Sequence, residues 1–130
     1  MDGRLKDSEW IILRALWGEE PLDMKRVVER VQAQNPALKW DYKTYHSFLR
    51  MLCAKGLIGA KREGRSNRYY PLVSERQALS LEADSLAERR GYYGSVSSLM
   101  VSMAERGKLT AEEKRELMAL AERLSREEGP

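Results

Sequence analysis

Apolar residues recur at every third or fourth position in three successive segments of the first 55 residues. This spacing places them on one face of a helix, so it predicts three amphipathic helices. We place these helices at residues 7–17, 23–34 and 41–55. An aspartate stands where each helix begins and can accept hydrogen bonds from the free amides of the first turn: Asp7, Asp23 and Asp41.

Apolar and polar residues then alternate with a period of two, which is typical of strands. We expect strands at residues 57–62 and 68–72, with residues 63–67 forming the tip of a hairpin between them. Pro71 cannot donate a backbone hydrogen bond, so the second strand ends there or lies at an edge. Three helices followed by a hairpin are the order of a winged helix-turn-helix.

The composition changes after Val73, and no further strand is predicted. Capping-box patterns begin two segments, one at Ser74 and one at Thr110. We predict three tail helices, at residues 74–90, 95–106 and from 110 onward, with a break at residues 91–94. The fold class is therefore mainly α: a winged helix-turn-helix domain at residues 1–73 and a helical dimerisation domain at residues 74–130.

The tail helices are short and amphipathic, and so small a set of helices cannot bury its apolar faces alone. A second copy of the chain would supply the missing half of a core, and a two-fold dimer suits a protein that binds two half-sites. The alternative is that the tail folds back on its own N-terminal domain. The expected dimer-interface residues are Val96, Leu99, Met100, Met103, Leu117, Leu120 and Leu124.

The third helix has two distinct faces. Its apolar face carries Tyr45, Phe48, Leu49 and Leu52 and is expected to pack on the first two helices. Its opposite face carries Lys43, His46, Ser47, Arg50 and Ala54. Such side chains bind base edges or phosphates, and Thr44 in the first turn is placed to hold a phosphate. We expect Lys43, Thr44, His46, Ser47 and Arg50 to bind DNA.

Charge is divided unevenly along the chain. Residues 1–73 hold 14 Lys and Arg against 9 Asp and Glu, whereas residues 74–130 hold 9 against 11. Residues 43–68 hold seven basic residues and one acid, a pattern typical of a phosphate-binding surface or of a solvated basic face. In the hairpin, the expected contacts with the DNA backbone or minor groove are Arg62, Arg65, Ser66 and Arg68.

Composition excludes several other classes. No apolar run is long enough to span a membrane, and the first seven residues do not resemble a secretory signal. One cysteine and one histidine cannot form a soft-ligand metal site, so we expect neither a metal nor a cofactor. His46 and Cys53 lie two helical turns apart, too far to act as a base and a nucleophile, so an enzyme is not expected. We expect a cytoplasmic protein.

Residues of the third predicted helix, the hairpin and the tail resemble the penicillinase-repressor family (BlaI/MecI/CopY). The resemblance rests on Trp40-x-x-Lys43-Thr44-x-x-Ser47, on Lys55-Gly56-Leu57-Ile58 and on Arg62-Glu63-Gly64-Arg65 followed by Tyr69-x-Pro71. In the tail it rests on Gly94-Ser95 and on Leu109-Thr110-x-Glu112-Glu113. It covers nearly the whole chain, and its third-helix and hairpin motifs are specific.

This resemblance implies a homodimeric repressor of transcription that binds an inverted-repeat operator in double-stranded DNA. It also implies a membrane sensor peptidase as a partner, with cleavage at Ser102-Met103. Some members have Asn-Phe at that point and this chain does not, so induction with and without proteolysis remain alternatives. The paired C-terminal cysteines of the copper-responsive branch are absent from this sequence. The competing function is a winged-helix adaptor that binds proteins without specific DNA binding.

Overall fold

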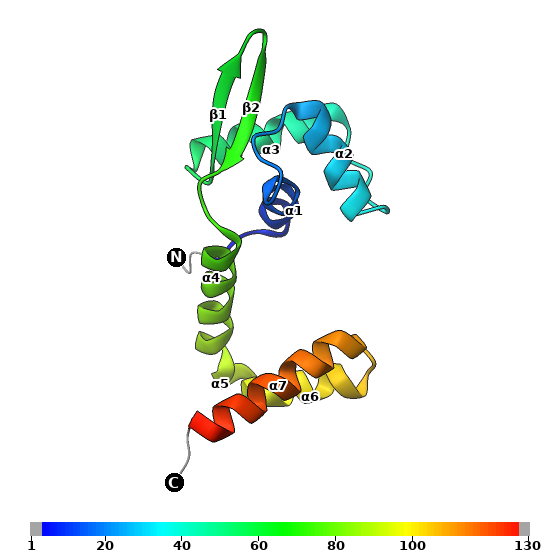
Figure 1. The fold of residues 1–130 in the computed structure, drawn as a ribbon, viewed down its shortest axis with the longest axis vertical. Helices are drawn as coiled ribbons and strands as arrows, with labels where there is room; N and C mark the ends of the chain where they lie inside the picture. The colour runs from blue at the N-terminus through cyan, green and yellow to red at the C-terminus, as the bar shows by residue number, and fades with distance from the viewer. Residues whose placement is uncertain (1–3, 128–130) are drawn as a thin grey trace. The chain divides into compact units, whose positions relative to one another are not determined.

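The computed structural model of the chain describes residues 4–127, which divide into two compact units between Ser85 and Leu86. The ends of the two predicted domains, residues 1–3 and 128–130, lie outside the described residues. The first unit contains α1 (Asp7–Leu16), α2 (Met24–Gln34), α3 (Tyr42–Ala54), β1 (Ile58–Glu63), β2 (Ser66–Pro71) and most of α4 (Glu75–Glu88) (Figure 1). The second contains α5 (Arg90–Tyr93), α6 (Val96–Glu105) and α7 (Ala111–Glu127).

The first unit has the predicted order of three helices and a hairpin. The strands β1 and β2 pair antiparallel, from Ile58 opposite Pro71 to Glu63 opposite Ser66. The pairing continues closer to the tip than predicted, so the turn contains only Gly64 and Arg65. Gly64 has a φ of +60°, which a type II′ hairpin turn needs at its first central position. Ser66 therefore lies on β2 and its predicted place at the hairpin tip was wrong, whereas Arg68 lies on the second strand as predicted.

A third short strand segment joins the hairpin to the helices. Leu22 forms an isolated antiparallel bridge with Tyr69. The two residues exchange both backbone hydrogen bonds, with N···O distances of 2.9 and 2.7 Å. This bridge ties the base of the wing to the segment that precedes α2. Two paired residues produce no periodic pattern, so the sequence gives no sign of this bridge.

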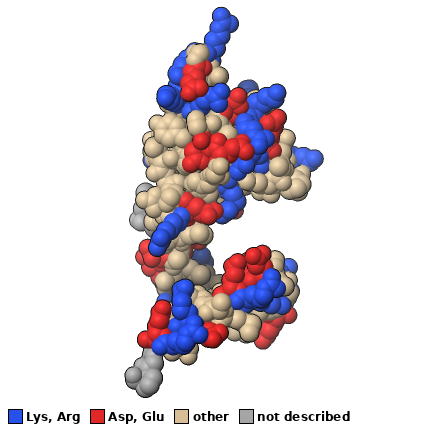
Figure 2. All heavy atoms as spheres, in the orientation of Figure 1, with Lys and Arg blue, Asp and Glu red and all other residues tan. Residues whose placement is uncertain are grey.

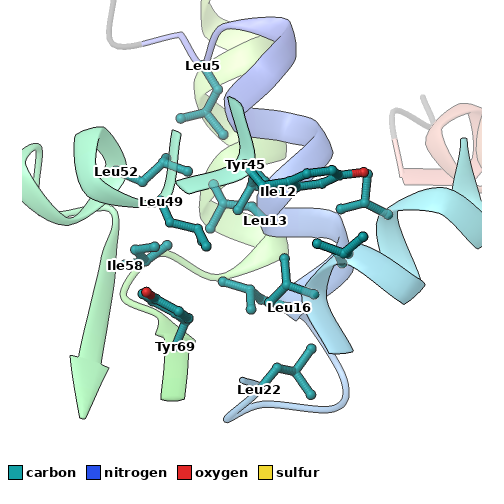
Figure 3. Packing of buried hydrophobic residues seen from close by; sticks show 14 of the residues in the cluster. Leu5, Ile12, Leu13, Leu16, Leu22, Tyr45, Leu49, Leu52, Ile58 and Tyr69 are labelled. Carbon is teal, nitrogen blue, oxygen red and sulfur yellow. The ribbon is translucent and has the colours of Figure 1, made fainter. Parts of the chain in front are cut away.

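One hydrophobic core holds the first unit together, and every one of its elements contributes to it. Figure 3 shows side chains of α1 and α3 meeting those of the hairpin, with Leu22 at one edge. Burial of a large apolar side chain of this kind contributes about 1.5–3 kcal/mol. The largest fully buried side chains are Ile12, Leu13, Leu16, Val27, Val31, Tyr45, Leu49, Leu52 and Ile58.

The aspartates at the starts of α2 and α3 cap these helices as predicted. Asp23 accepts a hydrogen bond from the amide of Arg26, and Asp41 accepts one from the amide of Thr44. The N-cap of α1 is Lys6 instead of Asp7, which lies inside the first turn. The Lys6 amide donates to Oε1 of Glu9 at 2.8 Å, so Glu9 closes the first turn in place of an aspartate cap.

Two tryptophans and an arginine on one side of α1 hold the beginning of α4. The rings of Trp10 and Trp17 meet edge to face with centroids 5.9 Å apart, and the guanidinium of Arg14 lies within 6 Å of both. Three hydrogen bonds join these side chains to the following segment: Trp10 to Glu82, Arg14 to Glu75, and Trp17 to the carbonyl of Val73.

These contacts extend the first compact unit beyond the predicted boundary at Val73. Ala78 and Ser85, both on α4, are 1% and 4% exposed. Ala78 belongs to the hydrophobic core of the winged helix. The unit therefore ends at Ser85, about 12 residues later than the sequence suggested. The early turns of the predicted tail stabilise the winged helix itself.

After the last residues of α4, the second unit has a single helical turn, α5, where the sequence predicted a break between tail helices. The tail accordingly has four helices instead of three. Ser95 caps α6 through the amide of Ser98, and Thr110 and Glu113 form the predicted capping box of α7. No residue of α5, α6 or α7 is buried. Within residues 4–127, no helix is both long and apolar enough to cross a membrane.

Candidate nucleic-acid interface

The outer face of α3 presents the side chains that the sequence analysis selected. Lys43, His46, Ser47 and Arg50 are exposed, whereas Tyr45, Leu49 and Leu52 on the opposite face are 2% exposed or less. The helix ends at Ala54 with Lys55 as its C-cap, and Gly56, with a φ of +77°, turns the chain into the wing. Packing on one face therefore fixes the direction of the polar side chains on the other.

Thr44 differs from these four exposed residues because both of its donors form hydrogen bonds within the protein. Its amide and its hydroxyl both donate to Oδ1 of Asp41, at 2.9 and 2.8 Å. The hydrogen bond from the backbone amide and that from the hydroxyl hold the pKa of the Asp41 carboxyl below its usual value. One donor of the first turn is thus occupied by Asp41. The role of Thr44 in holding a phosphate stays a prediction.

The cations of the first unit differ in whether an acid neutralises them. Arg14, Arg26, Arg30 and Lys55 each form an ion pair with a glutamate. Among the described residues, no ion pair involves the cations on the outer face of α3, at the wing turn or on most of the wing: Lys43, Arg50, Lys61, Arg62 and Arg65. An uncompensated set of cations of this kind attracts phosphate.

The wing carries its polar side chains on both faces of a two-stranded ribbon. Lys61 faces the same side as Arg68, its partner in the register, and Arg62 shares the other side with Asn67. Arg65 occupies the second position of the turn. Figure 2 shows Lys and Arg atoms at the end of the hairpin, with acidic atoms among them. The exposed tip and the strand ends therefore form a basic ridge.

Arg68 differs from the other wing cations because it has an acidic neighbour. Its Nε lies 2.7 Å from Oε2 of Glu63. The same Nε is buried and has no well-oriented hydrogen bond among the described residues, so the contact is an ion pair and not a hydrogen bond. Arg68 is also half-buried, whereas Arg62 and Arg65 are exposed.

Two exposed residues of α3 were missed by the sequence analysis. Met51 is 48% exposed and Tyr42 is 59% exposed. Helical spacing puts Met51 beside Ser47 and Tyr42 beside His46, so both lie at the edges of the outer face. Their apolar character led us to leave them out. Met51 directly follows Arg50 and Tyr42 directly precedes Lys43, and these positions could have indicated that both residues border the outer face.

The cysteine of α3 has the environment of a packing residue. Cys53 is half-buried, and burial raises the pKa of its thiol, so it remains protonated near neutral pH. Within the described part of the chain, no group of three or more His, Cys, Asp and Glu side chains is placed to hold a metal ion.

The residues expected at the dimer interface lie in α6 and α7. Met103, Leu120 and Leu124 are 38%, 39% and 44% exposed. The other four are half-buried: Val96, Leu99, Met100 and Leu117. The suggested cleavage point, Ser102-Met103, lies inside α6, two residues before its end at Glu105.

Three helices, a two-stranded wing and a third helix with a polar outer face define a winged helix-turn-helix regulator. A model of the penicillinase repressor family matches residues 5–123. The chain belongs to this family, as its motifs predicted. Members of the family are repressors of transcription and not enzymes, so the sequence-based exclusion of an enzyme is confirmed.

Relatives of this chain align with it over most of their length. A penicillinase repressor of Bacillus licheniformis is 24% identical over 119 residues, which are 92% of this chain and 90% of the relative. The methicillin resistance regulatory protein MecI of Staphylococcus aureus (strain N315) is 25% identical over 113 residues, 87% of this chain and 89% of the relative. A crystal structure of SSV1 F-93 is 19% identical, covers 68% of this chain and 93% of its own, and has a TM-score of 0.45.

Proposed function

We propose that two copies of this chain bind an inverted-repeat operator in double-stranded DNA and repress transcription from it. In each half-site, α3 lies in the major groove and the wing lies against the neighbouring backbone. The proposal assigns DNA binding to Lys43, His46, Ser47, Arg50, Arg62 and Arg65, with Thr44, Ser66 and Arg68 at the margins. It places the protein in the cytoplasm, with access to DNA.

The observation that carries the proposal is the row of unpaired cations on the outer face of α3 and on the wing. A buried face holds α3 firmly, so Lys43 and Arg50 project from a rigid scaffold. Arg is the side chain best suited to the acceptor pair of guanine, and Ser47 can donate or accept. The cations of the wing suit phosphate contacts, which position a protein without reading sequence.

The dimer in this proposal is formed by the tail, residues 74–130, chiefly through the helices that follow α4. Their apolar side chains remain partly exposed within a single chain, and a second copy would cover them. Two linked half-sites bind more tightly than one, because the second contact forms at a high effective concentration. We therefore assign dimerisation to residues 74–130, although the first turns of α4 also stabilise the winged helix.

A sensor peptidase remains a proposal that the family resemblance suggests. The Ser102-Met103 bond lies in a helix, so a peptidase would need this part of α6 to unfold first. Because α6 has no buried residue within its chain, opening it costs less in a monomer than in a dimer that covers it.

A gel-shift experiment with the DNA upstream of the gene for this protein, over a series of salt concentrations, tests DNA binding. The expected result is a retarded complex whose affinity falls steeply with salt, because bound phosphates release counterions. Random DNA of equal length is the control for sequence specificity. Equal affinity for both DNAs, or no complex at low salt, would favour the protein-binding adaptor.

A further inference from the structure

Glu63 is the single acidic residue between Lys43 and Arg68 in the sequence, and it lies at the end of β1 beside the wing turn. The strand register places Lys61 opposite Arg68 and Glu63 opposite Ser66. Residues paired in this way point to the same side of a sheet. Glu63 therefore shares one face of the wing with two cations that stand directly opposite each other.

The carboxylate of Glu63 contacts only one of these two cations. Its Oε2 lies 2.7 Å from Nε of Arg68, and among the described residues it forms no ion pair with Lys61. Like charges that face each other across two strands repel, so this contact also relieves the repulsion between Lys61 and Arg68. The Nε of Arg68 has no hydrogen bond among residues 4–127, which leaves Glu63 as the group that compensates it.

We infer that Glu63 sets the DNA affinity of the wing by holding the guanidinium of Arg68, and that Arg68 is released only when a phosphate displaces the carboxylate. Glu63 is a positioning residue that acts through Arg68. The inference rests on the proposed function. A phosphate and the carboxylate compete for one guanidinium, so the free protein presents fewer available wing cations than its sequence contains.

The size of this effect follows from the exposure of the pair. The side chains of Arg68 and Glu63 are 41% and 47% exposed, so water screens their attraction and the pair is weak. Breaking it before DNA binds therefore costs a modest part of the affinity. We expect removal of the carboxylate to tighten binding about two- to fivefold, a change that conventional titrations resolve.

The test is a double-mutant cycle that uses a labelled random duplex and therefore needs no knowledge of the operator. The full-length chain and the variants Glu63→Gln, Arg68→Ala and the double variant are titrated by fluorescence anisotropy over a range of salt concentrations. Glu63→Gln is expected to tighten binding about two- to fivefold with little change in its salt dependence, because Arg68 contacts a phosphate in both complexes and only the cost of breaking its ion pair is removed. In the Arg68→Ala background, most of this gain is expected to disappear.

Glu122→Gln is the matched control, because Glu122 also pairs with an exposed arginine, Arg126 at 2.8 Å, on α7. This variant is expected to bind DNA as the unaltered chain does. An equal gain from Glu63→Gln with and without Arg68 would show simple repulsion of phosphate and overturn the inference, as would no gain at all. No DNA binding by the unaltered chain at low salt would instead contradict the proposed function.

Discussion

The carboxylate of Glu9 lies 2.6 Å from the ammonium of Lys55, and this contact joins the first turn of α1 to the end of α3. Glu9 is only 8% exposed, although it carries a charge. Its other oxygen accepts the backbone amide of Lys6 at 2.8 Å. Both oxygens are thus satisfied inside the protein. The pair fixes the C-terminal end of the helix that we assign to the major groove.

We expect Glu9→Gln to lower the free energy of unfolding by about 1–2 kcal/mol, because a charged hydrogen bond to Lys55 is lost. Urea unfolding at pH 7 measures this change. Glu29→Gln is the matched control, since Glu29 forms an exposed pair with Arg26 at 3.5 Å and is expected to contribute little. Equal stability of Glu9→Gln and the unaltered chain would show that the buried pair has no net effect.

The same pair predicts a pH dependence. Burial by itself would raise the pKa of the Glu9 carboxyl, but the hydrogen bonds from Lys55 and from the Lys6 backbone outweigh it and hold the pKa below its ordinary value of 4.5. The stabilisation is therefore complete above that value and is lost as the pH falls through the lower pKa of the folded state. The stability difference between Glu9→Gln and the unaltered chain should shrink below pH 4.5 and stay constant from pH 6 to 8.

On the outer face of α3, Lys43→Ala and Arg50→Ala are each expected to weaken operator binding by about 1–3 kcal/mol. Both side chains are exposed, so the melting temperature should not change. Anisotropy titrations and thermal melts of the same samples measure the two effects. Lys114→Ala, an exposed lysine of α7, is the control. A fall in melting temperature that matches the loss of affinity would mark these positions as structural.

At the wing turn, Arg65→Ala should weaken binding to operator and to random DNA by nearly the same factor. Arg65 occupies the exposed turn after Gly64, where contact with the backbone is favoured over contact with bases. Titrations of both duplexes at one salt concentration measure the ratio. Weakening confined to the operator would instead assign Arg65 to base recognition.

The sequence predicted those features that depend on neighbouring residues. Asp41 caps α3, and the spacing of Tyr45, Leu49 and Leu52 fixes which face is buried. Both capping boxes of the tail also form, since a Ser or Thr and the Gln or Glu three residues later meet within one turn. The exposed positions of Lys43 and Arg50 follow from this local geometry.

Other features escaped prediction because they depend on residues far apart in the sequence. Glu9 looked like an ordinary residue of a first turn, and its pairing with Lys55 across 46 positions has no local signature. The hydrogen bonds of Trp10 to Glu82 and of Trp17 to the carbonyl of Val73 likewise join residues more than 50 positions apart. Because of these contacts the first unit extends to Ser85, and the change of composition at Val73 did not indicate that boundary.

Because Ala78 belongs to the core of the first unit, a shortened chain must retain α4 up to Ser85. A chain of residues 1–85 is expected to be a folded monomer that binds one half-site weakly. Leu120→Asp in the full chain should give the same result, since a buried carboxylate opposes association strongly. Leu120 is 39% exposed in one chain, so this substitution should leave the fold of the chain intact.

Sedimentation of the full-length protein at micromolar concentration, alone and with a labelled duplex carrying the inverted repeat, tests the central claim most directly. We expect a dimer in the absence of DNA and two chains on each duplex, with binding much tighter than that of residues 1–85. A monomer that binds the duplex no more tightly than residues 1–85 would contradict the dimeric repressor. It would instead favour a tail that folds back on its own N-terminal domain.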